Sequence, residues 1–385
     1  MGKRVIIIVL DSVGAGYMDD AADFGDTGAN TLANTADAAG GLHLPNLEKL
    51  GLGNIIRIKG VDPVAEPLGK FGRIREASTG KDTMTGHWEM MGIISKEPFP
   101  LYPEGFPDEI VDEFIKRTGV KGILGNIAAS GTEIIKELGR EHMRSGFPIV
   151  YTSGDSVFQI AAHNETIPLD RLYSYCIAAR EMCDKYRIGR VIARPFKGAE
   201  GRFIRTADRR DYPMRPPGDT VLDLIKMSGF RVTGIGKIED IYAKQGISRA
   251  IHTQSNGEGM DILTEEIRIT NEGLIFINLV DFDMLYGHRR DAEGYASALE
   301  EFDKKLGDFL PQIGTDDLLI ITSDHGCDPT FRGTDHTREF VPLLVFGQGL
   351  SAENLNVRET LADIGVSALE YLGIGNPGFP GKCFI

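Results

Sequence analysis

Three unbroken apolar runs constrain the fold of this chain more than any other feature of its sequence. They cover residues 5–10, 274–280 and 318–322 and consist mostly of Val, Ile and Leu. Such a run predicts a strand buried on both faces, as in a parallel sheet that helices cover on each side. Residues 294–310, between the second and third runs, place apolar side chains at helical spacing. This order of strand, helix and strand predicts a parallel crossover.

Two further pairs of elements extend the pattern. Residues 219–230 predict a helix that Asp219 opens, and a strand follows at 231–235. A strand at 341–346 is followed in the same way by a helix at 360–372. We therefore expect an α/β core with a mainly parallel sheet flanked by helices on both faces.

Chain length and local composition predict two domains. The 385 residues exceed the roughly 100 to 200 residues of one typical domain. From about residue 99 to residue 213, Pro and Gly become frequent and the predicted segments become shorter. The stretch YPMRPPG at its end resists helix and suits a return linker. We expect a discontinuous core at 1–98 and 214–385 and an inserted α/β cap domain at 99–213.

The composition argues against several partners. A formal net charge of -14 disfavours nucleic acid and anionic membranes, because both attract basic surfaces. The four cysteines have irregular spacing and no CxxC motif, which fits neither a disulfide framework nor a zinc knuckle. The N-terminal apolar run is too short for a signal segment, and no stretch approaches the roughly 18 apolar residues of a membrane span. We expect a soluble, cytoplasmic protein, and the sequence indicates no obligate protein partner.

Acidic residues follow all three apolar runs. The first run is followed by Asp11, the second by Asp281 and Asp283, and the third by Asp324 and His325 after one serine. Ligands of open parallel sheets bind beyond the carboxyl ends of the strands, so these groups should share one crevice. Carboxylates crowded in this way repel one another unless a cation or protonation relieves the repulsion. A metal site is the simplest explanation.

Two more histidines enlarge the predicted site. His288 lies in DFDMLYGH after the second run, and His336 lies in GTDHTRE after the third. Mixed nitrogen and oxygen ligands favour manganese, zinc or iron over calcium, and magnesium stays open on the carboxylate-rich side. Six candidate ligands suit two metal ions about 3.5 to 4 Å apart. The competing interpretation is that each buried Asp or His is an ordinary structural residue.

A loop rich in Gly and hydroxyl groups, STGKDTMTGHWE at 78–89, is the second candidate motif. A turn that opens a helix attracts phosphate through its backbone amides. The loop is not a Walker A motif, because Asp82 follows Gly80-Lys81 where that motif needs Ser or Thr. A hydroxyl beside a metal can act as a nucleophile. The sequence logic leaves four candidates open, Ser78, Thr79, Thr83 and Thr85, and an ordinary capped turn remains the alternative.

A basic cluster is the third signal. Residues 187–215 contain nine Lys or Arg and three Asp or Glu, in a chain whose net charge is -14. Guanidinium groups match phosphate geometry, so arginines in the cap would suit the non-reacting phosphate of a small substrate. A solvated charged face is the alternative.

Five motifs, in this order, resemble those of a known family. They are DSVGAG from Asp11, GKDTMTGHWE from Gly80, LVDFDMLYGHRRD from Leu279, SDHG from Ser323 and GTDHTREFVPLL from Gly333. With the cap segments YTSGDSVFQIAAH and GRVIARPF, they make essentially the whole chain similar to bacterial phosphopentomutases of the alkaline phosphatase superfamily. SDHG alone would be weak, whereas the ordered set is specific.

The resemblance implies an alkaline-phosphatase-like α/β core with an inserted cap, acting on ribose or 2-deoxyribose phosphates. It implies two divalent metal ions, most simply Mn²⁺, and a phosphorylated nucleophile at Thr83. The first ion would be held by Asp11, Asp324 and His325 with Thr83, and the second by Asp283, His288 and His336. Substrate-binding roles fall on Ser153, Asp155, Val157, Arg190, Ile192 and Arg205 of the cap and on Lys237 of the core.

The implied reaction interconverts the 1- and 5-phosphates of the pentose. Phospho-Thr83 would pass its phosphoryl group to the free hydroxyl of a pentose monophosphate, and the resulting 1,5-bisphosphate would return its other phosphate to Thr83. A sugar bisphosphate is the expected primer. Two alternatives stay open: a phosphatase or another phosphosugar mutase of the same superfamily, and a non-catalytic phosphosugar-binding protein. The last should have lost a ligand or the nucleophile, yet all seven matched positions are present.

One position departs from the family pattern. Cys327 stands in SDHGCDP, where the pattern leads us to expect Asn. A thiol so near a ligand pair would raise affinity for soft metals or make the site sensitive to oxidation. A small buried residue is the simpler interpretation.

Overall fold

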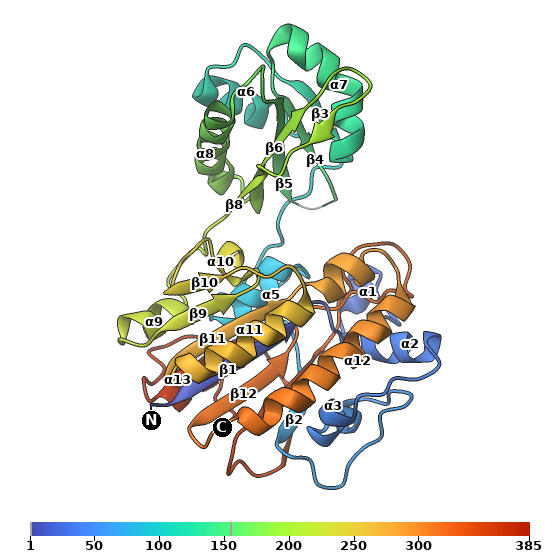
Figure 1. The fold of residues 1–385 in the computed structure, drawn as a ribbon, viewed down its shortest axis with the longest axis vertical. Helices are drawn as coiled ribbons and strands as arrows, with labels where there is room; N and C mark the ends of the chain where they lie inside the picture. The colour runs from blue at the N-terminus through green and yellow to red at the C-terminus, as the bar shows by residue number, and fades with distance from the viewer. Residues whose placement is uncertain (1, 155) are drawn as a thin grey trace. The chain divides into compact units, whose positions relative to one another are not determined.

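The computed structural model describes residues 2–154 and 156–385, so the expected role of Asp155 lies outside the described residues. The chain forms two compact units, and each is described by itself (Figure 1). One unit comprises Met1–Pro98 with Pro216–Ile385, and the other is Phe99–Arg215. The second unit is therefore a continuous insertion in the chain of the first.

The first unit is built on an eight-stranded sheet in the order β10-β9-β11-β1-β12-β13-β2-β14. All neighbouring pairs are parallel except those of β13, which runs against both β12 and β2. The strands are β1 (Arg4–Leu10), β2 (Lys70–Ile74), β9 (Val232–Ile235), β10 (Arg249–Ile251), β11 (Gly273–Leu279), β12 (Asp317–Thr322), β13 (Val341–Phe346) and β14 (Glu353–Arg358).

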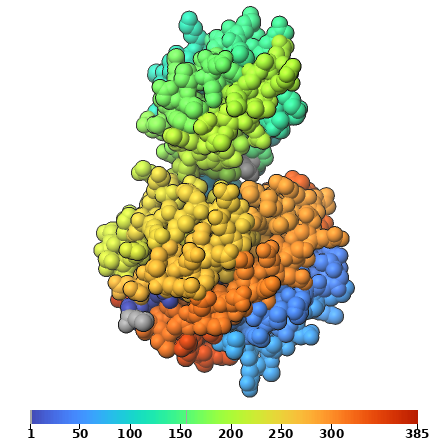
Figure 2. Space-filling model, in the orientation of Figure 1, coloured from blue at the N-terminus to red at the C-terminus, as the bar shows by residue number. Residues whose placement is uncertain are grey.

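Helices cover both faces of this sheet. Ile6 and Ile8 of β1 belong to a buried core with Leu263 and Leu299, which lie on two long helices, α11 and α12. These helices lie in front of the sheet in Figure 1, and yellow and orange atoms of this part of the chain cover that face in Figure 2. Ile7, between them, faces the opposite side of the sheet because successive side chains of a strand alternate. It is also buried, and α13 contacts β1. The helices of the unit are α1 (Ala21–Phe24), α2 (Thr31–Ala38), α3 (Pro45–Lys49), α4 (Leu52–Ile55), α5 (Thr83–Met90), α9 (Val221–Met227), α10 (Ile238–Ile241), α11 (Asn256–Ile269), α12 (Ala292–Phe309), α13 (Ala362–Leu372), the π-helix η1 (Phe282–Gly287) and the 3-10 helix η2 (Leu310–Gln312).

Three details differ from the sequence predictions. Thr220, not Asp219, caps α9, because its side chain accepts a hydrogen bond from the backbone of Asp223 and the carboxylate of Asp223 bonds back to Thr220. The strand β13 is antiparallel, because the segment 323–340 that leads to it contains no crossover helix. A further strand, β14, precedes α13, and its mostly exposed sequence ENLNVR has no apolar run to announce it.

The second unit is also an α/β structure. Its sheet has the order β3-β4-β5-β6-β7, with β8 paired to β6, and mixes parallel and antiparallel neighbours. One buried cluster joins the sheet to α6 and α8, and a second cluster on the other face joins it to α7 (Figure 1). The elements are β3 (Leu124–Ala128), β4 (Ile149–Thr152), β5 (Val157–His163), β6 (Arg190–Lys197), β7 (Ile204–Arg205), β8 (Arg210–Pro213), α6 (Asp108–Thr118), α7 (Gly131–Ser145) and α8 (Leu169–Lys185).

Two further observations bear on the sequence predictions. Among the described residues, no helix has both the length and the apolar character that crossing a membrane requires. All four cysteines are free thiols, three of them buried.

Candidate metal centre

The carboxyl ends of three neighbouring strands bring the predicted ligands together. The strand β1 lies between β11 and β12 and is parallel to both, with Leu10 opposite Leu279 and Val9 opposite Thr322. The acidic residues that follow these strands therefore emerge at one edge of the sheet. Asp11, Asp283 and Asp324 are all buried there.

The first group of ligands surrounds His325. Its Nε2 lies 3.5 Å from Oδ1 of Asp11 and 3.3 Å from Oδ2 of Asp324. The same nitrogen lies 3.1 Å from the hydroxyl oxygen of Thr83. Asp11, Asp324 and His325 have ligand atoms within 4.8 Å of one another, a spacing that could hold a metal ion.

The second group surrounds Asp283. Its Oδ2 lies 3.2 Å from Nε2 of His288, and its Oδ1 lies 3.4 Å from Nε2 of His336. The two histidine nitrogens are 3.2 Å apart. Asp283 and His288 are linked by the π-helix η1, in which the backbone N–H of His288 donates to the carbonyl of Asp283. This five-residue turn places both side chains on the same side of the chain.

The two groups form one continuous cluster. The rings of His325 and His336 have centroids 4.0 Å apart, and Asp283, His325 and His336 also satisfy the spacing of a metal site. The structure thus brings together all six Asp and His ligands that the sequence predicted, with Thr83 beside them.

Unpaired oxygens show that these residues fit a cation. One oxygen of each carboxylate, Asp11 Oδ1, Asp283 Oδ1 and Asp324 Oδ2, is buried without a well-formed hydrogen bond among the described residues, and imidazole nitrogens lie 3.1 to 3.5 Å from these oxygens. A buried carboxylate oxygen without a partner is costly, and a divalent ion bound by oxygen and imidazole donors removes that cost. The donor set therefore fits one or two divalent metal ions.

The pKa shifts of these carboxyl groups also indicate a site that suits a cation. Burial and the charges of Asp324 and Asp283 raise the pKa of Asp11 well above its ordinary value. Burial alone would also raise the pKa of Asp283, but His336 and His288 hold it well below its ordinary value. The hydrogen bond with Asp283 in turn raises the pKa of His288 to about 12. A bound cation or added protons would relieve the repulsion among these carboxylates.

The imidazoles are oriented for ligation. Nδ1 of His288 lies 2.7 Å from the carbonyl oxygen of Thr334, and Nδ1 of His325 lies 3.1 Å from the carbonyl oxygen of Gly326. A ring that donates from Nδ1 keeps Nε2 free of a proton. In the neutral form of each ring, Nε2 could then offer its lone pair to a metal ion bound by the carboxylates.

Thr83 is the hydroxyl residue of the loop that reaches this cluster. The hydroxyls of Ser78 and Thr79 instead form hydrogen bonds with the backbone of Ser95, and that of Thr85 donates to Asp82. Thr83 is the first residue of α5 and its Oγ1 contacts Nε2 of His325. The N-terminus of a helix carries partial positive charge and unpaired N–H groups, which favour a phosphate at this position.

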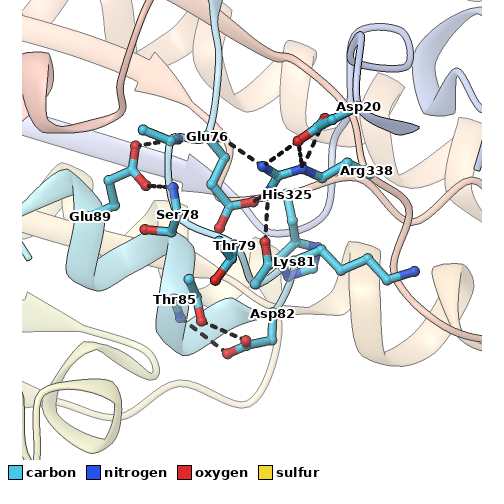
Figure 3. Close-up of polar contacts among 12 residues, drawn as sticks. Asp20, Glu76, Ser78, Thr79, Lys81, Asp82, Thr85, Glu89, His325 and Arg338 are labelled. Atoms are coloured by element: carbon cyan, nitrogen blue, oxygen red, sulfur yellow. Dashed lines mark hydrogen bonds and ion pairs between the residues drawn. The ribbon is translucent and has the colours of Figure 1, made fainter. Parts of the chain in front are cut away.

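The loop before Thr83 is held firmly at both ends (Figure 3). The carboxylate of Glu89, on α5, accepts hydrogen bonds from the backbone N–H groups of Ala77 and Ser78 at 2.8 and 2.6 Å. The buried guanidinium of Arg338 donates to the carbonyl oxygen of Gly80 at 2.7 Å and to Glu76. These contacts fix the position at which α5 begins.

Two residues that the sequence reasoning missed support the ligands from behind. Nδ1 of His87 lies 2.9 Å from the carbonyl oxygen of Thr83 and 3.1 Å from Oδ2 of Asp324. The side chain of Asn278 donates to Oδ2 of Asp11 at 2.7 Å. Each is a single polar residue inside a predicted element, so no spacing pattern marks it.

Two backbone features allow α5 to meet the residues that follow β1 and β12. A Cβ on Gly86 would lie 2.3 Å from the carbonyl oxygen of Asp324, so only glycine allows α5 to approach the end of β12 this closely. Ser12 has a φ of 74°, in the left-handed region, and its N–H donates to Oδ1 of Asp324 at 3.1 Å. This uncommon conformation sits directly after the ligand Asp11.

The predicted substrate residues of the cap lie in the second unit. Ser153 follows β4, Val157 begins β5, and Arg190 and Ile192 lie on β6. Val157 is opposite Arg190 in the sheet, so Val157, Arg190 and Ile192 share one face. Arg205 ends β7, next to the far end of β6. Lys237 belongs to the first unit, where it is exposed before α10.

A basic hollow surrounds Arg205. It measures about 410 Å³ and is lined by Arg194, Pro195, Arg205, Thr206, Ala207 and Arg209. Arg209 is paired with Asp211, whereas Arg194 and Arg205 form no ion pair with any described residue. Burial raises the pKa of the Tyr151 hydroxyl, and the charges of the three arginines partly offset this effect. This hydroxyl has no hydrogen-bond partner among the described residues. The sequence predicted a basic cluster but could not select Arg194 and Arg209 from it.

The fold and this cluster of carboxylates and imidazoles define a metalloenzyme. A sequence model of the Metalloenzyme superfamily matches residues 3–376. This chain is similar in fold to a solved structure of phosphoglycerate mutase from Leishmania mexicana, determined at low cobalt concentration. The TM-score is 0.50, and the match covers 99% of this chain and 97% of that chain at 12% identity. The predicted alkaline-phosphatase-like α/β fold is confirmed.

Closer relatives define the family. Phosphopentomutase from Caldanaerobacter subterraneus subsp. tengcongensis is 54% identical over 100% of this chain and 98% of its own length. Phosphopentomutase from Symbiobacterium thermophilum is 53% identical over 98% of this chain and 96% of its own length. The chain belongs to the phosphopentomutase family, as the sequence motifs predicted.

Proposed function

We propose that this isomerase interconverts the 1- and 5-phosphates of ribose or 2-deoxyribose through phospho-Thr83 and a 1,5-bisphosphate. The main evidence for this proposal is the position of Thr83. Its hydroxyl lies 3.1 Å from Nε2 of His325, in a cluster of six Asp and His side chains that could bind metal ions. Membership of the phosphopentomutase family supplies the substrate class.

The ligand set supports two metal sites that share one cluster. Asp11, Asp324 and His325 would hold the first ion beside Thr83, and Asp283, His288 and His336 would hold the second. When bound, the ions neutralise the oxygens of the transferring phosphoryl group and lower the pKa of the attacking hydroxyl. The mixture of carboxylate and imidazole ligands supports Mn²⁺ as the ion.

The residues of α5 position the nucleophile. Thr83 begins the helix, so its phosphorylated form would lie at the positive end of the helix dipole. His87 holds the backbone of Thr83, while Glu89 and Arg338 fix the preceding loop. Preorganised groups of this kind reduce the reorganisation that phosphoryl transfer requires.

The second unit would bind the phosphate that is not being transferred. Arg194 and Arg205 line the hollow and form no ion pair with a described carboxylate, and a phosphate dianion would supply counter-charge to them. Val157, Arg190 and Ile192 share a sheet face on which the sugar would lie, with Ser153, Asp155 and Lys237 completing the expected set. A sugar bisphosphate that phosphorylates Thr83 would prime the cycle. The free cysteines support a cytoplasmic location.

Mapping of the phosphorylated residue tests this proposal. The Mn²⁺-loaded enzyme is incubated with a pentose 1,5-bisphosphate, quenched and digested, and we expect one phosphopeptide with the modification on Thr83. Thr83→Ala should lose both the phosphopeptide and mutase turnover. Thr79→Ala, which removes an exposed hydroxyl of the same loop, is the matched control and should keep both. Phosphate on another residue, or full turnover by Thr83→Ala, would overturn the assignment.

A further inference from the structure

The thiol of Cys327 lies among the ligands of the second group. Asp283, His288 and Cys327 have ligand atoms within 4.8 Å of one another, the same spacing that joins the other candidate ligands. Cys327 follows the His325 segment after one glycine and is buried. Its Sγ lies 3.8 Å from the carbonyl oxygen of Asp335 and also contacts the side chain of His288.

The neighbouring backbone leaves room for this sulfur. A Cβ on Gly287 would lie 2.9 Å from Sγ of Cys327, so the residue before His288 must be small where the thiol is present. The π-helix η1 thereby brings Asp283 and His288 to the sulfur from one side. The unpaired Oδ1 of Asp283 is a second, independent sign that these donors meet around a cation.

The donor set can accommodate the thiol. Asp283, His288 and His336 provide one oxygen and two nitrogens, so the sulfur would be a fourth protein ligand, and a five-coordinate ion would keep one position open for the phosphoryl group. For metal–sulfur and metal–nitrogen bonds of about 2.3 and 2.0 Å, the sulfur and nitrogen of a tetrahedral site lie about 3.5 Å apart. The ligand atoms of this group lie within 4.8 Å of one another and would draw together to that distance on binding an ion.

We infer that Cys327 is a fourth protein ligand of the second metal site and shifts the preference of that site toward thiophilic divalent ions. The inference rests on the two-metal centre of the proposed function. Binding converts the thiol to a thiolate, forms one metal–sulfur bond and releases one proton to solvent. Soft thiolate ligands favour ions such as Zn²⁺, Co²⁺ and Cd²⁺ over Mn²⁺, which prefers oxygen.

Cobalt substitution gives a direct spectroscopic test. The metal-free full-length protein is titrated with Co²⁺, and we expect a near-ultraviolet thiolate-to-cobalt charge-transfer band that reaches its maximum as the second site fills. Cys327→Ser should lack the band, whereas Cys183→Ala, which removes a buried thiol in the second unit, should keep it. A band that is absent from the unaltered protein, or that persists in Cys327→Ser, would overturn the inference.

Metal competition provides a second readout. In Cys327→Ser the ratio of Zn²⁺ to Mn²⁺ affinity at the second site should fall roughly tenfold or more. Cys327→Asn serves the same purpose if the serine variant folds poorly. An unchanged ratio would contradict ligation by sulfur. Mutase turnover of the unaltered Mn²⁺ enzyme is measured separately. If the cobalt band is absent but turnover is normal, only the role of Cys327 is refuted. If turnover is absent, the cobalt band still shows whether Cys327 binds the ion.

Discussion

The hydroxyl of Thr83 lies 3.1 Å from Nε2 of His325, although the two residues are 242 positions apart in the chain. Thr83 begins α5, and His325 follows the strand β12. Gly86 permits the close approach, and His87 links the backbone of Thr83 to Asp324. A hydroxyl at a helix N-terminus is thereby delivered to a cluster of metal ligands, which is the arrangement that phosphoryl transfer to a threonine requires.

Metal removal should destabilise the protein, because crowded carboxylates lose their counter-charge. At 100 times its dissociation constant, a metal that binds only the folded state contributes about 2.7 kcal/mol. We expect added Mn²⁺ to raise the Tm of the chelator-treated protein by several degrees in differential scanning calorimetry. Asp283→Asn should reduce this shift, and Asp308→Asn, which alters an exposed carboxylate on α12, should preserve it. Equal shifts in both variants would argue against the site.

His87 should position the first metal site without binding the ion. Loss of a group that orients a ligand commonly weakens metal affinity about 10- to 100-fold. We expect His87→Ala to lower Mn²⁺ affinity in that range by isothermal titration calorimetry. His87→Asn places a side-chain nitrogen near the position of Nδ1 and should recover much of the loss. If alanine and asparagine variants bind Mn²⁺ equally, His87 has no orienting role.

The basic hollow should determine affinity for the sugar phosphate. Hydrogen bonds to charged groups contribute about 1.5 to 3 kcal/mol, so Arg205→Ala and Arg194→Ala should each raise KM for ribose 5-phosphate roughly 10- to 100-fold. Arg202→Ala removes an exposed arginine of the same segment that does not line the hollow, and KM should be unchanged. Steady-state kinetics would contradict the assignment if all three variants behaved alike.

Stability should depend on the protonation of Glu339. This buried carboxyl accepts hydrogen bonds from Thr31 and Thr337, yet burial raises its pKa from the ordinary 4.5 to about 7. The folded state holds this proton more tightly than the unfolded state, so protonation of Glu339 stabilises the fold at low pH. This contribution is lost progressively as the pH rises from 4.5 through about 7. The loss amounts to about 3 kcal/mol at about 1.4 kcal/mol per pKa unit.

Glu339→Gln tests this effect, because its amide oxygen can face the N–H of Thr31 while its NH₂ group faces the two threonine hydroxyls. Chemical denaturation between pH 4.5 and 7 should show a shallower loss of stability in Glu339→Gln than in the unaltered protein. Glu104→Gln, an exposed change, should follow the unaltered protein. Parallel pH profiles for Glu339→Gln and the unaltered protein would refute the prediction.

The three central strands and the acidic residues that follow them are the part of this structure that the sequence predicts best. The apolar runs at β1, β11 and β12 could be recognised because strands buried on both faces must be continuously apolar. Their parallel alignment then places Asp11, Asp283 and Asp324 at one edge. Acidic residues at strand ends are thus informative even when the strands are far apart in the chain.

Other features have no comparable signature. The strand β14 is mostly exposed and polar, so no apolar run marks it. Asp219 and Thr220 are both good helix caps, and only the return hydrogen bond from Asp223 selects Thr220. Asn278 is one polar residue inside an apolar strand, and its contact with Asp11 depends on the pairing of β11 with β1.

Ribose 1-phosphate turnover tests the central claim most directly. The full-length protein is loaded with Mn²⁺, primed with a sugar bisphosphate and followed by phosphorus NMR with ribose 1-phosphate as substrate. The account predicts conversion to ribose 5-phosphate with little inorganic phosphate, and loss of that conversion in Thr83→Ala. Release of inorganic phosphate and free ribose without ribose 5-phosphate would contradict it and identify a phosphatase.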